Sequence, residues 1–258
     1  MKLYFIEAGV DYKKYNFPYI IIAEPESEKE ILKLFEKGFL PYNHNLTQFY
    51  LCRNIRIKLS EFTPSSENRR ILRKGEGISF KLKKRNEFKF NDNWLKFCKD
   101  YADQRFGKDI MSESRLLSLF HSPVTSHIME FYNDNQIIGI VVLYIIEKQL
   151  TYYYYSFYDL KYFNKNLGMY MMTSAVKYFS ENNFQYIYLG TCYSKNALYK
   201  TQFKGMEFFN GRYWSSNLKE LKFLIKNYAN NEIKNVFEID EYSKYTNKSQ
   251  TIFSGGLI

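Results

Sequence analysis

Runs of hydrophobic residues between positions 127 and 190 predict four strands and one helix. Apolar segments at 127–132, 136–146 and 150–158 have strand length, and the polar turn 133–135 joins the first two. Segments of this kind joined by short turns form antiparallel neighbours. The loop at 164–170 then opens a helix, and a fourth strand is expected at 186–190.

Three antiparallel strands, a helix and a further strand make up the order of the acetyltransferase fold. We therefore predict an α+β protein of the acetyltransferase-like (GNAT) type, with a mixed sheet flanked by helices. Such a fold places a thioester or ester donor at the start of the helix that follows the meander. The aromatic run at 152–158 ends the third strand beside that position.

The first 62 residues are expected to form a small N-terminal α/β unit. Strand patterns occur at 19–23 and 49–59, and an apolar helical stripe lies between them. Ser27 and Glu30 have capping-box spacing before this stripe, and Gly38 follows it.

The acetyltransferase-like core should then occupy residues 63–215, with additional helices at 93–105 and 114–120. A C-terminal helix capped by Asn217 and a loosely held polar tail should occupy residues 216–258.

Composition narrows the class of protein. The 258 residues are 45% hydrophobic, which is too apolar for a disordered chain, and they carry a formal net charge of +10. A basic surface favours polyanions such as RNA, DNA or anionic lipid, although many basic proteins bind none of these.

Cysteine usage and hydropathy bear on the compartment and on metal binding. The three cysteines are far apart and form no CxxC pair, which indicates a reducing compartment and argues against a disulfide framework or a metal site. No signal peptide or membrane span is evident, so we expect a soluble cytoplasmic protein without a membrane partner.

Two segments have chemistry suited to phosphate. If the stretch after the Pro-Ser break at 62–66 is helical, Arg69, Arg70, Arg73 and Lys74 gather on one side, where they could bind phosphates or form a solvated charged face. At the loop 164–170, backbone N–H groups would attract phosphate and Gly168 would permit a close approach. One glycine is a weak coenzyme A signature, and an ordinary strand-to-helix turn is the alternative.

A series of short motifs resembles the arginyl-tRNA–protein transferases and their bacterial leucyl-transferring relatives, the aspartate/glutamate leucyltransferases. The motifs keep family order and spacing from about residue 38 to 214. They are CRNIRI at 52–57, FTPS at 62–65, RRILRK at 69–74, YSFYD at 155–159, NLGMY at 166–170, YLG at 188–190, YK at 199–200 and GRYW at 211–214. These relatives are acetyltransferase-fold enzymes that move an amino acid from aminoacyl-tRNA to a protein N-terminus.

The resemblance implies roles for specific residues. Asp159 would orient or deprotonate the acceptor amine, or hold the cationic group of the aminoacyl moiety, with Tyr158 beside it; a turn cap is the structural alternative for Asp159. The residues expected to contact tRNA are Arg69, Arg70, Arg73, Lys74, Gly168 and Lys200, where Gly168 leaves room for the terminal nucleotide and Lys200 could instead be a plain surface lysine. The substrate pocket would be lined by Tyr155, Phe157, Tyr193 and Tyr199. Of Tyr155, Phe157 and Tyr158, at least one alternates to the other face of the strand and should lie in the core instead.

Two departures from the family pattern leave other functions open. The N-terminal cysteine cluster is missing, since Phe17 stands where a cysteine would be expected, and the loop 191–198 is short and lacks Cys-Pro-Lys-Met. No metal and no cofactor other than the aminoacyl-tRNA co-substrate are therefore expected. The alternatives are a coenzyme A-dependent N-acyltransferase and a non-catalytic tRNA- or peptide-binding relative.

Overall fold

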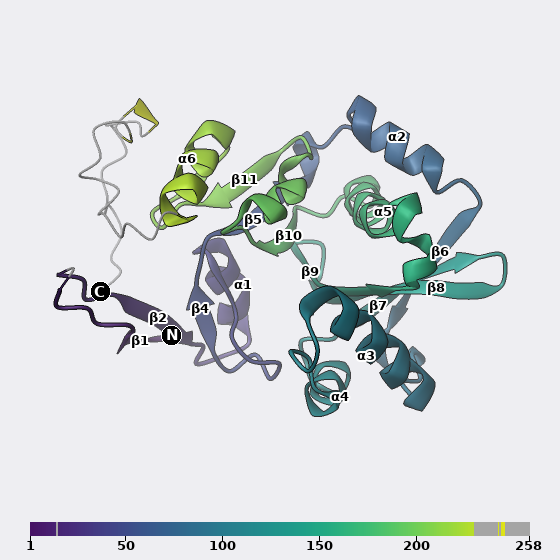
Figure 1. The fold of residues 1–258 in the computed structure, drawn as a ribbon, viewed down its shortest axis with the longest axis horizontal. Helices are drawn as coiled ribbons and strands as arrows, with labels where there is room; N and C mark the ends of the chain where they lie inside the picture. Colours follow the sequence, from purple (N-terminus) through teal and green to yellow (C-terminus); the bar gives the residue numbers. More distant parts are fainter. Residues whose placement is uncertain (14, 230–241, 243, 246–258) are drawn as a thin grey trace.

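The fold contains two β-sheets of unequal size (Figure 1). The structure, a computed structural model, describes residues 1–13, 15–229, 242, 244 and 245. Within these residues the small sheet has the strand order β1-β2-β4-β3. Its strands are β1 (Lys2–Glu7), β2 (Tyr19–Glu24), β3 (Phe39–Pro41) and β4 (Phe49–Leu51).

The large sheet carries the core of the protein. Its strand order in the described residues is β12-β11-β5-β10-β9-β8-β7-β6, and only the β9–β10 pair is parallel. The strands are β5 (Asn54–Lys58), β6 (Ile78–Lys84), β7 (His127–Asn133), β8 (Gln136–Ile146), β9 (Leu150–Tyr158), β10 (Tyr186–Thr191), β11 (Met206–Phe209) and β12 (Trp214–Ser215). A mixed sheet with a central meander confirms the predicted acetyltransferase-like architecture.

Helices cover both faces of the large sheet (Figure 1). They are α1 (Lys29–Glu36), α2 (Ser66–Lys74), α3 (Asp92–Phe106), α4 (Glu113–His121), α5 (Leu167–Glu181) and α6 (Leu218–Ala229). In Figure 1, α2 and α5 lie on one side of β7 and β8, and α3 and α4 lie on the other. The short 3-10 helices are η1 (Leu59–Glu61), η2 (Arg85–Glu87), η3 (Leu160–Lys165) and η4 (Lys195–Thr201).

Helix α2 begins with a capping box that fixes its first turn. The Ser65 hydroxyl accepts a hydrogen bond from the Asn68 backbone N–H (3.1 Å), and the Asn68 side chain accepts one from the Ser65 N–H (3.1 Å). Both bonds satisfy backbone donors that a helix start leaves unpaired. Tyr170 of α5 fills the space beside Gly75, which follows α2, and its hydroxyl donates to the Ile78 carbonyl (2.8 Å). These contacts hold the C-terminal end of α2 against α5.

Two local predictions for the N-terminal region are wrong. The Ser27–Glu30 capping box does not form: α1 has Glu28 as its N-cap with no side-chain capping bond, and the Glu30 carboxylate instead accepts from the Glu26 N–H (2.9 Å). The segment 49–59 is not one strand, because β4 belongs to the small sheet and β5 pairs with β10 and β11 of the large one.

The division into three domains at 1–62, 63–215 and 216–258 stays a prediction. Strand β5, which belongs to the first of these segments, lies inside the large sheet. The Asn217 side chain caps α6 as expected, accepting from the backbone N–H groups of Lys219 and Glu220. The predicted loose tail from about residue 241 falls largely outside the described residues.

Candidate functional site

The parallel strands β9 and β10 part half-way along the large sheet. They pair only where Tyr186–Tyr188 lies beside Leu150–Tyr152, after which β9 continues to Tyr158 and β10 to Thr191. The register between β8 and β9 shifts at the same level, because Tyr154 is an extra residue between the partners of Leu143 and Val142. A bulge of this kind turns the strand and is common beside functional sites. We take the region between the separating strand ends as the candidate site.

Gly168 lies at the start of α5, against the end of β9. A β-carbon on Gly168 would lie 2.9 Å from Cε1 of Tyr158, which is closer than such atoms approach. The glycine therefore makes room for the Tyr158 ring, and its predicted contact with a terminal nucleotide stays a prediction. Tyr158 is buried, with its ring 4.9 Å from that of Tyr101 of α3.

Tyrosine hydroxyls gather around this point. Tyr101, Tyr153 and Tyr158 are buried, and the more exposed Tyr199 phenol interacts electrostatically with Tyr158 and the Arg105 guanidinium. Burial raises the pKa of Tyr101 and of Tyr153 well above the usual value. Both phenols therefore remain protonated near neutral pH and can donate hydrogen bonds.

Asp159 follows β9 directly and caps η3. Its Oδ1 accepts from the Lys161 backbone N–H (2.9 Å), and its own N–H donates to the Ile138 carbonyl (2.8 Å). Among the described residues, no hydrogen bond to its second carboxylate oxygen is present. The structure thus shows the capping role and leaves one oxygen able to bind a cationic group.

Lys200 of η4 is not the surface lysine that the sequence allowed. Its Nζ points inward and donates to the Thr191 carbonyl (2.9 Å), at the end of β10. The side chain is partly buried, and its neighbours are the thiols of Cys52 and Cys192. Burial lowers the pKa of Lys200 from 10.5 to about 8, and the two thiols offset this only in part.

The lowered pKa predicts a pH dependence of stability that Lys200→Met removes. Because the folded-state pKa is about 8 and the ordinary value 10.5, the unfolded chain binds more protons between these pH values. The free energy of unfolding should therefore rise by about 3 kcal/mol from pH 7 to pH 10.5 through this group alone. Urea denaturation of wild type and Lys200→Met at both pH values measures the difference. If the free energy of unfolding depended equally on pH in the two proteins, the Lys200 amine would not be in a buried environment that disfavours its charged form.

The four cations of α2 are all exposed, but they differ in their partners. Arg69 donates to the Pro64 carbonyl (2.6 Å), and Arg70 forms a two-pronged ion pair with Glu67 (2.5 and 2.7 Å). Within the part of the chain that the structure describes, Arg73 and Lys74 form no ion pair. These last two side chains are therefore the ones most free to bind an external phosphate.

The four residues predicted to line a substrate pocket do not share one environment. Phe157 has no exposed surface and packs on Tyr101 and Phe120, so its assignment to a pocket is corrected to the core. Tyr155 is half-buried and stacks on Phe157. Tyr199 is 46% exposed, beside Lys200. Tyr155 and Phe157 differ in exposure because of the packing of α3 and α4, which the strand pattern does not reveal.

Tyr193, the fourth of these residues, ties the end of β10 to β5. Its hydroxyl accepts from the Arg53 backbone N–H (2.8 Å), and the Arg53 guanidinium carbon lies 5.0 Å from its ring centroid. This tyrosine therefore holds the segment after β10 against the residue before β5.

Sequence reasoning missed the central position of Arg56 on β5. Its guanidinium lies between the rings of Tyr186 (4.2 Å) and Trp214 (3.9 Å) and pairs with Glu207 (2.7 Å). The signal was present, because Arg56 is the arginine of the CRNIRI motif and Trp214 ends the GRYW motif. The two motifs therefore contact each other in the fold, through Arg56 and Trp214.

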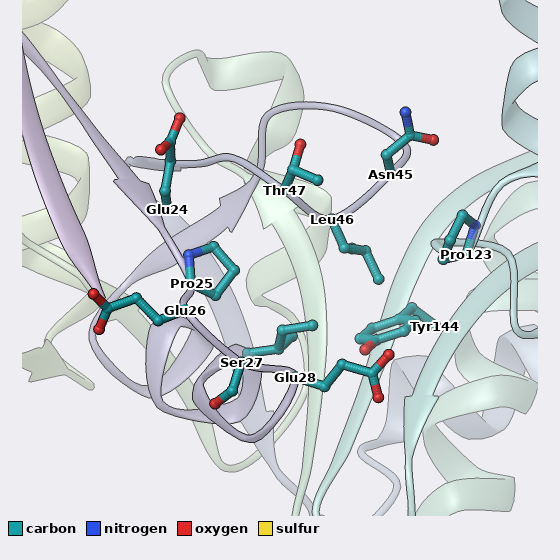
Figure 2. A pocket seen from close by; sticks show the side chains of 11 residues that line it. Glu24, Pro25, Glu26, Ser27, Glu28, Asn45, Leu46, Thr47, Pro123 and Tyr144 are labelled. Carbon is teal, nitrogen blue, oxygen red and sulfur yellow. The ribbon is translucent and has the colours of Figure 1, made fainter.

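A cavity of about 580 Å³ lies elsewhere, between the small sheet and the large one (Figure 2). Its wall combines apolar side chains with Glu24, Glu26 and Glu28. None of the predicted site residues lines it. The strand separation and this cavity are thus different places in the fold.

No group of three or more metal-ligating side chains occurs in the described residues, and no described helix has the length and apolar character to cross a membrane.

Comparison with known proteins matches the region that builds this site. A family model described as "Arginine-tRNA-protein transferase, C terminus" matches residues 93–210. Similar curated proteins are aspartate/glutamate leucyltransferases: that of Vibrio parahaemolyticus is 25% identical over 70% of this chain and 81% of its own, and that of Pseudomonas aeruginosa 26% over 74% and 85%. The chain is thus similar to these transferases, and the family model covers a little under half of it.

Coverage of the aspartate/glutamate leucyltransferases varies. The protein of Dinoroseobacter shibae is 25% identical over 63% of this chain, and the match spans 62% of its length. Among solved structures, L-PGS from Bacillus licheniformis has a TM-score of 0.42 at 14% identity (66% of this chain, 51% of that one), and FemX a TM-score of 0.41 at 12% identity (68% and 64%).

Proposed function

We propose that this protein moves an amino acid from aminoacyl-tRNA to the N-terminal α-amine of a protein or peptide. The observation that carries the proposal is the family match over residues 93–210, which includes β9, β10 and the start of α5. The candidate site lies between these elements. The matched curated relatives are named as transferases of leucine.

The chemistry needs no covalent enzyme intermediate, because an aminoacyl ester is already activated. The protein has to bring the ester close to an amine, move a proton and stabilise the oxyanion. We assign the free carboxylate oxygen of Asp159 to the cationic amine. The Tyr158 hydroxyl, beside the N-terminus of α5, would donate to the reacting carbonyl, where the helix dipole also favours negative charge.

The aminoacyl-tRNA would bind with its acceptor stem along α2. Helix α2, which carries these exposed cations, packs against α5, and both helices lie on the same side of the sheet (Figure 1). Phosphate binding there would orient the charged 3′ end towards Asp159. The acceptor would be a protein or peptide in the cytoplasm, where charged tRNA is available.

Removing Arg73 or Lys74 should weaken tRNA binding in a salt-dependent way. Each phosphate contact that is lost lowers the slope of log affinity against log salt by about one. Filter binding of Arg73→Ala and Lys74→Ala from low to moderate salt measures this, with Lys33→Ala, an exposed lysine of α1, as the matched control. Unchanged slopes in both α2 variants would place the tRNA contact elsewhere.

Binding also separates this proposal from a coenzyme A enzyme. Titration calorimetry with acetyl-coenzyme A, run beside an electrophoretic shift with tRNA, should give binding only to tRNA. Binding of acetyl-coenzyme A alone would favour the N-acyltransferase, and tRNA binding without turnover would favour a non-catalytic relative.

A further inference from the structure

We propose that Lys200 takes the proton from the acceptor's α-amine and does not contact tRNA phosphates. This inference rests on the proposed transfer reaction and deepens it. Lys200 follows β10 by way of a short loop, so its amine lies where β9 and β10 have separated.

The geometry holds the amine at the site. Nζ donates to the Thr191 carbonyl (2.9 Å), and no other hydrogen bond to it occurs among the described residues. Gly190, with φ of +83°, lies below it: a β-carbon there would lie 3.5 Å from Nζ. An ammonium has three donors, so two remain for a substrate. A lysine side chain that points into the protein cannot reach tRNA phosphates bound at its surface.

The groups facing Lys200 leave its charge uncompensated. They are the Cys52 thiol between β4 and β5, the Cys192 thiol after β10 and the Tyr199 ring of η4, whose centroid lies 5.9 Å from Nζ. Arg53 adds a positive charge beside Cys192. In the described residues, no carboxylate forms an ion pair with Lys200, whereas a structural buried lysine normally has one.

The pKa of Lys200 suits removal of a proton from an α-ammonium group. Burial brings the pKa of Lys200 to about 8. An ordinary α-ammonium has a pKa of about 8, so proton exchange between the two is nearly balanced. A base is most effective when its pKa lies near the working pH. A surface lysine would stay protonated and could not act in this way.

The step balances as follows. Neutral Lys200 removes one proton from the acceptor ammonium, and the freed nitrogen lone pair attacks the ester carbonyl carbon. The new carbon–nitrogen bond forms as the carbon–oxygen bond to the tRNA ribose breaks. Lys200 returns its proton to the leaving ribose oxygen, and the extra proton on the new amide nitrogen passes to water.

Three variants of Lys200 test the assignment in the full-length protein. Lys200→Met should lower kcat for transfer by about 100-fold while the KM for charged tRNA is unchanged, because one acid–base group is lost. Lys200→Arg should lose as much, since a guanidinium stays charged. Added methylamine should restore part of the activity of Lys200→Ala. Lys195→Met, an exposed lysine of the same 3-10 helix, should behave as wild type.

Different outcomes separate the two levels of the proposal. Full activity in Lys200→Arg, or a raised KM for tRNA at unchanged kcat, would overturn the base assignment and leave the transferase intact. Loss without methylamine rescue in a folded variant would also overturn it. If wild type transfers no amino acid from any charged tRNA, the proposed function fails and the assignment fails with it.

Discussion

Replacing Arg56 by alanine should lower the free energy of unfolding by about 3 kcal/mol, because it leaves the partly buried Glu207 carboxylate (23% exposed) without its partner. The Arg56 side chain is 10% exposed, and its Nε donates to Glu207 (2.7 Å). The substitution also removes the cation between the Tyr186 and Trp214 rings. Chemical denaturation monitored by tryptophan fluorescence measures the loss.

Arg70→Ala is the matched control for Arg56. It also removes an arginine from an ion pair with glutamate, but the Arg70 side chain is 44% exposed. Exposed pairs contribute little, so the loss should stay below about 1 kcal/mol. Equal losses in the two variants would show that burial of the Arg56 pair does not decide its contribution.

Gly38→Ala should destabilise the protein by about 3 kcal/mol for two separable reasons. The glycine follows α1 with φ of +88°, a conformation that other residues adopt at a cost. A β-carbon there would also collide with the buried Phe209 ring of β11. The measured quantity is the midpoint of urea denaturation at constant slope.

Gly77→Ala separates the two contributions. Gly77 has nearly the same backbone angle, φ of +87°, but no atom lies within 4 Å of a β-carbon placed there. Only the conformational cost of about 1 kcal/mol should remain. A loss as large as that of Gly38→Ala would assign the whole effect to backbone conformation and contradict the contact with Phe209.

Much of the meander could be predicted from the sequence. The boundaries of β8 and β9 match the expected strands, because each apolar run is bounded by polar turn residues. The strands within 49–59 were harder to predict, because the apolar pattern continues across the point where the chain passes from the small sheet to the large one. Local periodicity carries no information about which sheet a strand joins.

The candidate site was less accessible from sequence, because its properties arise from distant segments. The burial of Lys200 depends on Cys52, which lies about 150 positions earlier in the chain. Phe157 was placed in a pocket although α3 and α4 cover it. Asp159 and Gly168, in contrast, were correctly located at the end of a strand and the start of a helix.

The most direct test of the central claim is transfer of radiolabelled amino acids from a total pool of charged tRNA to peptides with varied N-termini. We expect label on a peptide α-amine that requires intact charged tRNA and falls with Asp159→Asn. The labelled amino acid would also identify the donor. No label with any amino acid, together with no binding of tRNA, would contradict the assignment as an aminoacyl-tRNA-dependent transferase.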